Sequence, residues 1–248
     1  MPTGTDEDGG RDLEWDGCLN ARDFGGLPLT GGGVTPRGRV VRSDNPDKLT
    51  LEGWAGVWDF GVRTIVDLRR EDECAAGVER PADLTMLRVS WDEYPDEDWN
   101  TRNEPPGMPP SMRAFLRDYP GAPADAARAL IEAAPGAVLY HCAGGRDRSG
   151  LFTILLGALI GVTPDALFDD YRHSFERLLP YSRAAGIQQE IDFIESPDKA
   201  EHRARFFGEV RSVIAELDSI AAARVLMDGG LTEAQVDALR SRLVDGPS

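Results

Sequence analysis

The chain of 248 residues carries 27 Lys and Arg against 43 Asp and Glu, which gives a net charge of −16. Its hydrophobic fraction of 41% is enough for a core and excludes global disorder, while its charge excludes the usual electrostatic attraction to nucleic acid or an anionic membrane. The three cysteines and three histidines match neither a disulfide framework nor a zinc motif, so we expect no metal and no cofactor.

The first half of the chain predicts a tail followed by alternating strands and helices. Residues 1–12 are polar and rich in glycine, which indicates a flexible tail before a single domain over residues 13–248. The next segments, in chain order, predict a strand at 39–42, a helix from Thr50 to about Phe60, and buried strands at 62–68 and 84–90.

The second half of the chain predicts mostly helix around one further strand. Residues 91–110 hold six acids, one Arg and five prolines, and they predict a long loop. The remaining segments predict helices at 111–118, 123–134, 150–160 and 163–173, a strand at 137–141, and helices over 180–244 with breaks near Pro197 and Gly229. Strands alternating with helices indicate an α/β fold with a central, mostly parallel sheet flanked by helices.

Targeting and membrane signals are absent from the sequence. The longest apolar run, residues 151–162, has 12 residues, whereas a membrane-spanning helix needs about 20. The acidic N-terminal segment has no apolar stretch of the kind found in secretory signals. We therefore expect a cytoplasmic protein without stable membrane insertion, although the sequence leaves export without a signal open.

The most informative segment is HCAGGRDRSG at residues 141–150, which lies between a predicted strand and an apolar helix. A short loop at a helix N-terminus can turn successive backbone N–H groups toward one anion, and the helix dipole adds positive potential there. Glycines remove Cβ atoms where the backbone bends, and an Arg can hold two phosphate oxygens at once. The loop therefore predicts a phosphate site built by Ala143, Gly144, Gly145, Arg146, Asp147 and Arg148.

Cys142 opens this loop and is separated from Arg148 by five residues. A helix N-terminus and a nearby Arg favour the thiolate, which can attack phosphorus and form a phosphocysteine. Ser149 can then donate a hydrogen bond to the sulfur as it leaves. His141 precedes Cys142 and points to the opposite face at the strand end, so we expect it to bond the loop backbone and tune the thiol rather than act as a base.

The leaving oxygen needs a proton, which requires a carboxylic acid near the loop. Asp147 lies in the loop itself, and Asp92 follows the predicted strand at 84–90. The sequence favours Asp147 slightly because the bound anion fixes its loop. It leaves Asp92 open as the acid, with Asp96 and Asp98 as further alternatives.

The string HCAGGRDRSG resembles the active-site loop of the cysteine-dependent protein tyrosine phosphatases, and more closely that of the bacterial tyrosine/serine phosphatases, which reads HCxxGKDRTG. This chain differs from that subfamily at Arg146, where Lys is usual, and at Ser149, where Thr is usual. Further segments are similar to the subfamily: NARDFGGLPL at 20–29, GRVVRSDNPDKLT at 38–50, GVRTIVDLRREDE at 61–73 and GLTEAQVDALRSRLV at 230–244. The resemblance covers most of residues 15–245.

The resemblance implies a phosphatase-type fold without metal, in which Cys142 is the nucleophile and Arg148 holds the phosphate. It implies a phosphorylated protein as the substrate, foremost phosphotyrosine and also phosphoserine or phosphothreonine. Because the usual Lys is linked to broad substrates, Arg146 keeps a phosphoinositide or inositol-phosphate phosphatase as an alternative, with a phospholipid head group as partner. A phospho-binding pseudophosphatase is a weaker alternative. Part of residues 174–228 would form a helical lid, with ordinary helical cover of the core as the alternative, and the oligomeric state stays open.

Residues outside the loop are expected to have supporting roles. Arg69 is expected to pair with Glu71 or Glu73 rather than with phosphate. Cys18 and Cys74 are expected to be inert thiols, with a resolving role toward the oxidised nucleophile left open. Five further polar residues are expected to hold the N-terminal segment or to brace the loop: Asn20, Arg22, Asp23, Arg42 and Ser43.

Overall fold

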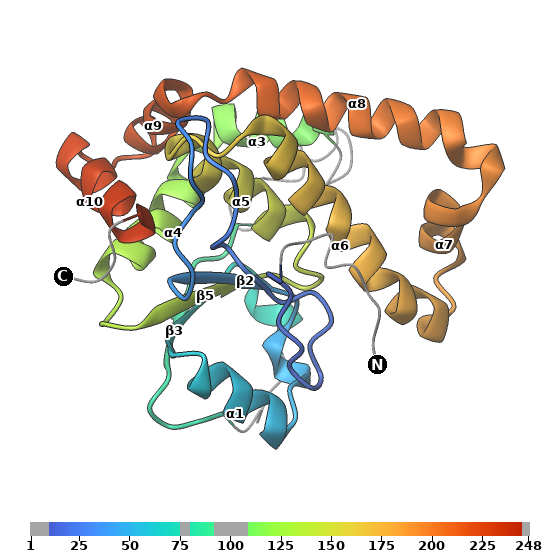
Figure 1. Cartoon of the computed structure of the whole chain (residues 1–248), viewed down its shortest axis with the longest axis horizontal. Coiled ribbons are helices and arrows are strands. Elements are labelled where there is room, and N and C mark those ends of the chain that lie inside the picture. The colour runs from blue at the N-terminus through green and yellow to red at the C-terminus, as the bar shows by residue number, and fades with distance from the viewer. Residues whose placement is uncertain (1–9, 75–79, 92–108, 245–248) are drawn as a thin grey trace.

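The structure is a computed structural model that describes residues 10–74, 80–91 and 109–244 (Figure 1). Among these residues, five strands form one sheet in the order β1-β2-β5-β3-β4. The strands are β1 (Arg22–Asp23), β2 (Val40–Ser43), β3 (Val62–Asp67), β4 (Thr85–Arg88) and β5 (Ala137–His141). Four of them run parallel and β1 runs antiparallel to β2, so the mostly parallel sheet predicted from the sequence is confirmed.

Helices cover both faces of this sheet, as Figure 1 shows. On one face lies α1 (Leu51–Asp59), and on the other lie α4 (Gly121–Glu132) and α5 (Asp147–Leu159). The second layer continues in the helices α3 (Pro109–Asp118), α6 (Pro164–Ala185), α7 (Gln188–Glu195), α8 (Ala200–Glu216), α9 (Ser219–Asp228) and α10 (Glu233–Val244). None of the helices in the described ranges is long and apolar enough to cross a membrane.

The two layers bury two separate apolar clusters because successive strand residues point to opposite faces of the sheet. Val40 and Val138 pack toward α5, whereas their neighbours Val41 and Leu139 pack toward α1. All four side chains are essentially buried. The sheet is therefore covered on both faces, which is why its strands read as continuous apolar runs.

Most predicted elements are confirmed, and the differences have local causes. The helix expected to end near His173 continues to Ala185, because its buried face continues through Phe175 and Leu178. The helix expected from Gly150 begins three residues earlier, within the loop. Arg11, expected in the flexible tail, is buried in the fold. β1 has two residues and is too short to produce a periodic pattern.

The carboxyl ends of the three central strands meet at one edge of the sheet. In the β ladder, His141 of β5 is paired with Ser43 of β2 on one side and with Asp67 of β3 on the other. In open α/β sheets, ligands bind at this edge, beyond the carboxyl ends of the strands. The loop that follows His141 therefore begins where this fold class places its functional sites.

Candidate active site

The loop from Cys142 to Arg148 connects β5 to α5, and its shape depends on one glycine. Gly145 has a φ of +66°, in the left-handed region. A Cβ at this position would lie 2.5 Å from the backbone nitrogen of Asp44. Glycine is required here both by the backbone conformation and by the close approach of the chain that follows β2.

The carbonyl groups of the loop are bonded on its outer side. Asn20 Nδ2 donates to the carbonyls of Gly144 at 2.9 Å and Gly145 at 3.0 Å, and the backbone N–H of Asn45 donates to the carbonyl of Ala143 at 3.1 Å. In a trans peptide the next N–H points opposite to the carbonyl. The N–H groups of residues 144, 145 and 146 therefore face the inner side of the loop, as an anion site needs.

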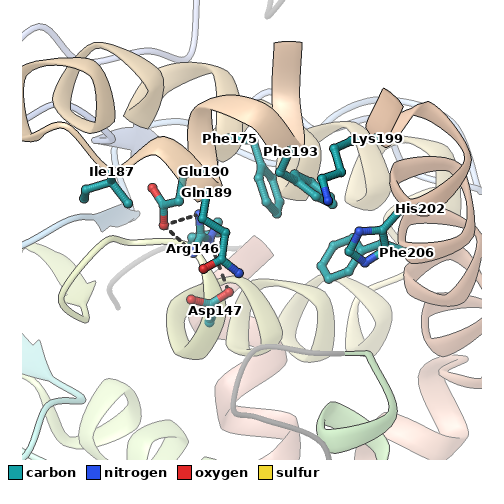
Figure 2. A pocket seen from close by; sticks show the side chains of 10 residues that line it. All are labelled: Arg146, Asp147, Phe175, Ile187, Gln189, Glu190, Phe193, Lys199, His202 and Phe206. Carbon is teal, nitrogen blue, oxygen red and sulfur yellow. Dashed lines mark hydrogen bonds and ion pairs between the residues drawn. The ribbon is translucent and has the colours of Figure 1, made fainter. Parts of the chain in front are cut away.

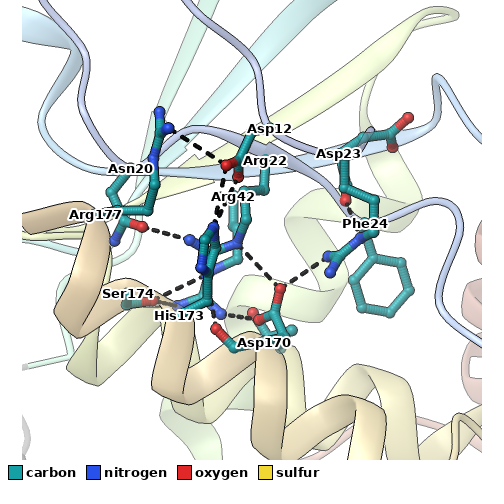
Figure 3. A network of polar contacts seen from close by, with 12 residues as sticks. Asp12, Asn20, Arg22, Asp23, Phe24, Arg42, Asp170, His173, Ser174 and Arg177 are labelled. Carbon is teal, nitrogen blue, oxygen red and sulfur yellow. Dashed lines mark hydrogen bonds and ion pairs between the residues drawn. The ribbon is translucent and has the colours of Figure 1, made fainter. Parts of the chain in front are cut away.

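A buried set of polar residues supports these carbonyls, and we call it the bracing network: Arg11, Asn20, Arg22, Arg42 and Asp170. Figure 3 labels all of them except Arg11. Asp170 of α6 accepts from Arg11 at 2.8 Å and from Arg22 at 3.1 Å, and it also pairs with Arg42. Arg42 donates in turn to the carbonyl of Gly145 at 2.6 Å. Burial alone would raise the pKa of Asp170, but the three arginines hold it well below its ordinary value.

The network extends the predicted supporting roles. Arg42 contacts the loop directly, and Arg22 bonds both Asn20 and Ser174 of α6, the latter at 2.9 Å. Arg11 and Asp170 complete the network, although no short motif in the sequence pointed to either. Through Arg42, a single buried carboxylate thus joins α6 to the loop, although Asp170 lies 25 positions after Gly145 in the sequence.

Cys142 and Ser149 lie at the inner end of the loop. Cys142 is 2% exposed, and its Sγ is 3.5 Å from the hydroxyl oxygen of Ser149. The structure therefore brings together the predicted nucleophile and the predicted hydroxyl donor. This distance permits an O–H···S hydrogen bond, which grows stronger as negative charge develops on sulfur.

His141, the last residue of β5, contacts the backbone at the start of the loop. Its Nδ1 is 3.2 Å from the carbonyl oxygen of Cys142, and since a carbonyl only accepts, Nδ1 is the donor. Its Nε2 lies 3.6 Å from Asp67 Oδ1. Burial lowers the pKa of His141 to about 4, in spite of the nearby Asp67, so the ring is neutral at neutral pH.

Arg148 forms a two-point ion pair that the sequence did not predict. Its Nη1 and Nη2 donate to the two carboxylate oxygens of Glu73 at 2.7 and 2.8 Å. The backbone N–H of Arg70 also donates to this carboxylate, at 3.0 Å. The hydrogen bonds from Arg148 lower the pKa of Glu73 to about 2. Glu73 thereby fixes the plane of the guanidinium, which directs two of its five donors to this carboxylate.

The prediction that Arg69 pairs with Glu71 or Glu73 is wrong. Its guanidinium pairs with Asp67 and Asp47, at 2.9 and 3.0 Å, and not with the side chain of Glu71 or Glu73. The two aspartates come from β3 and from the 3-10 turn that follows β2. Arg69 therefore links the two chain segments that flank β5.

Arg146 and Asp147 face away from the bracing network. Arg146 Nε lies 3.3 Å from Asp147 Oδ1, and its Nη1 and Nη2 each lie 3.3 Å from Glu190 of α7. The guanidinium also stacks 4.7 Å above the ring of Phe175. Arg146 thus points to α6 and α7, with its side chain mostly covered.

The alternative acids and the two other cysteines lie outside the loop. Asp92, Asp96 and Asp98 lie outside the described residues. Cys18 is buried, and its Sγ donates to Asp44 Oδ1 at 2.7 Å; burial and that carboxylate raise its pKa well above the ordinary value. Cys74 is half-buried, and burial also raises its pKa. Across the described ranges, no group of three or more His, Cys, Asp or Glu side chains could hold a metal ion.

Comparison with known proteins shows the family to which the chain belongs. The chain belongs to the tyrosine phosphatase family, whose profile matches residues 13–245. It is therefore an enzyme of that family, a phosphoric monoester hydrolase. A candidate tyrosine-protein phosphatase of Cupriavidus necator is 28% identical over 197 residues, which cover 74% of this chain and 70% of that protein.

Solved structures with weaker similarity include two of the protein TpbA from P. aeruginosa. One is 17% identical and covers 77% of this chain and 87% of that one, with a TM-score of 0.38. The other, with a cysteine-to-serine substitution and in complex with phosphotyrosine, is 18% identical and covers 83% and 86%, with a TM-score of 0.33.

Proposed function

We propose that this enzyme hydrolyses phosphotyrosine in protein substrates through a phosphocysteine on Cys142. The observation that carries the proposal is the loop backbone, whose carbonyls at 143, 144 and 145 are all bonded on the outer side. The opposed N–H groups can then surround the phosphate beside Sγ. Donors fixed in advance stabilise the charge of the transition state without reorganisation, which is a large part of catalysis by such sites.

The first step forms a bond between Cys142 Sγ and phosphorus while the bond from phosphorus to the tyrosyl oxygen breaks. Arg148, oriented by Glu73, holds phosphate oxygens together with the loop N–H groups. A carboxylic acid gives its proton to the leaving tyrosyl oxygen. We assign this acid to Asp147, whose side chain is 39% exposed and so can reach a substrate oxygen; Asp92 is the competing assignment.

The second step returns the enzyme to its starting state. Water attacks phosphorus, a new P–O bond forms and the S–P bond breaks, which releases inorganic phosphate and a thiolate. Ser149 donates its hydroxyl hydrogen to that departing sulfur, for which the distance of 3.5 Å is suitable. The carboxylate that gave its proton in the first step takes one from the water in the second.

The mechanism is tested with p-nitrophenyl phosphate and the variant Cys142→Ser. We expect the wild type to release phosphate and to give a phosphocysteine on rapid acid quench, and Cys142→Ser to do neither. Cys74→Ser is the matched control, because Cys74 is a half-buried thiol outside the loop. Turnover that survives Cys142→Ser would overturn the mechanism.

Two further comparisons decide the acid and the substrate class. Asp147→Asn should reduce kcat by about 10²-fold or more, with a smaller loss for Asp92→Asn; the reverse order would transfer the role to Asp92. Matched peptides with phosphotyrosine, phosphoserine or phosphothreonine, and a water-soluble phosphoinositide, are then ranked by kcat/KM. A higher kcat/KM for the phosphoinositide would replace the proposed substrate.

A further inference from the structure

A cavity of about 370 Å³ lies beside the loop, between α5, α6, α7 and α8 (Figure 2). Arg146 and Asp147 form its wall on the loop side. The cavity is therefore continuous with the candidate active site but does not include Cys142 or Arg148. Its volume is at the lower end of the range for ligand pockets, which run from about 300 to 1,000 Å³.

One wall of the cavity is aromatic. Phe175, Phe193 and Phe206 come from three different helices, and their ring centroids lie 5.3 to 5.8 Å apart. Phe193 belongs to α7, a helix that buries none of its residues completely. Phe193 is thus half-buried where it lines the cavity, and an apolar ligand group would remove its remaining surface from water.

The far side of the cavity carries basic groups. Lys199 and His202 line it opposite Asp147, as Figure 2 shows. Within the described ranges, the side chains of Lys199 and His202 make no hydrogen bond or ion pair, although the His202 ring packs edge-on against Phe193. Arg146 and Glu190, by contrast, already pair with each other. Arg146 also pairs with Asp147, so Lys199 at the far end is the cation of the lining that no carboxylate in the described ranges engages.

We propose that this cavity is a specificity subsite for the residues next to the phosphotyrosine of a protein substrate. It takes an apolar side chain against the three phenylalanines and a carboxylate at Lys199. The proposal rests on the proposed function, because it places the phosphotyrosine itself in the adjoining loop. A cavity of this volume holds one such pair of side chains but not the two acyl chains of a phospholipid.

The test uses four phosphotyrosine peptides that differ only beside the phosphotyrosine. The adjacent residue is Leu or Gly, and the next residue is Glu or Lys. We expect kcat/KM to be highest for the Leu-Glu peptide, by about tenfold over Gly-Lys, since one apolar contact and one exposed ion pair each contribute a few-fold or more. Turnover of p-nitrophenyl phosphate, which carries no neighbouring amino-acid residues, is the reference for each enzyme.

Matched variants separate the subsite from general effects. Lys199→Glu should reverse the preference between Glu and Lys, and Phe193→Ala should remove the preference for Leu. Arg205→Glu makes the same charge change on an exposed residue of α8 outside the cavity, and it should leave the ranking of the peptides unchanged. Lys199 is exposed, so its variant tests the proposal even if Phe193→Ala folds poorly.

The outcomes are distinguishable from failure of the proposed function. Equal kcat/KM for all four peptides, with turnover of p-nitrophenyl phosphate that still requires Cys142, overturns the subsite and leaves the function intact. Loss of the requirement for Cys142 overturns the function itself. If a water-soluble phosphoinositide with short acyl chains is preferred and that preference depends on Lys199, the peptide assignment is wrong and the cavity serves a lipid.

Discussion

The two sides of the 142–148 loop are built in opposite ways. On the outer side the bracing network is fully buried, and its hydrogen bonds fix the carbonyl groups of the loop. On the side of the cavity, Arg146 makes long, partly exposed contacts to Glu190, and α7 buries no residue completely. Under the proposed function and subsite, phosphate recognition and substrate selection are therefore separable: the first depends on buried geometry, and the second on a partly exposed surface.

The largest effect is expected from Asp170, the carboxylate of the bracing network. Asp170→Asn removes the carboxylate charge that three buried arginines share. Breaking a buried ion pair in this way costs about 3–5 kcal/mol. We expect a fall of that size in the free energy of unfolding, measured by urea titration.

Asp169→Asn provides the matched control for this prediction. Asp169 is the preceding residue of α6, its side chain is 63% exposed, and it lies 3.9 Å from Arg172. An exposed pair of this kind contributes at most about 1 kcal/mol. Equal destabilisation by the two variants would show that the network does not brace the loop.

His141 lies under the loop and gives the next largest effect, one that depends on pH. The folded state holds its pKa near 4, below the unfolded value of about 6.5. Unfolding therefore takes up a proton between these values, so the stability is complete above about pH 6.5 and declines as the pH falls toward 4. This difference between the folded and unfolded pKa values corresponds to about 3 kcal/mol in the free energy of unfolding.

The measurement compares wild type with His141→Asn, which keeps an N–H donor but does not titrate. Urea unfolding at pH 7 and at pH 4.5 should show a larger loss of stability in the wild type than in the variant. Carboxylates elsewhere titrate equally in both proteins and cancel in this difference. Parallel curves for the two proteins would mean that the histidine is not held neutral by burial.

Gly145 tests whether the loop geometry itself carries catalysis. Gly145→Ala introduces both a left-handed alanine, which costs about 1 kcal/mol, and a Cβ 2.5 Å from the backbone of Asp44. Displacement of the loop by about 1 Å should lower kcat/KM for p-nitrophenyl phosphate by about 10²-fold. Gly186→Ala has the same cost, at a φ of +67°, but nothing lies within 4 Å of its Cβ. Gly186→Ala should therefore lower stability without lowering activity. A similar loss of activity in both variants would show that catalysis does not depend on the shape of the loop.

The sequence predicted four of the five described strands, the loop and its likeness to a family because these are local patterns. The segment from Cys142 to Ser149 carries its chemistry in consecutive residues, and β5 was predicted with its observed bounds. Glu73 and Asp170 were missed as partners of the loop because they lie 75 residues before Arg148 and 25 residues after Gly145. Which carboxylate reaches which arginine is decided by packing of β3 and α6, and no spacing in one sequence encodes it.

The smallest effect is expected from Glu190 on the cavity side. Glu190→Gln removes the charge that Arg146 contacts at 3.3 Å, but the carboxylate is 36% exposed, so solvent already screens the pair. We expect a change in stability below about 1 kcal/mol and a kcat/KM for p-nitrophenyl phosphate within about threefold of wild type. Glu195→Gln is the control, since it removes a carboxylate of the same helix that pairs with Arg183 far from the loop. If Glu190→Gln instead lowered kcat as strongly as Gly145→Ala, the position of Arg146 would belong to the catalytic geometry, and the two sides of the loop would not be separable.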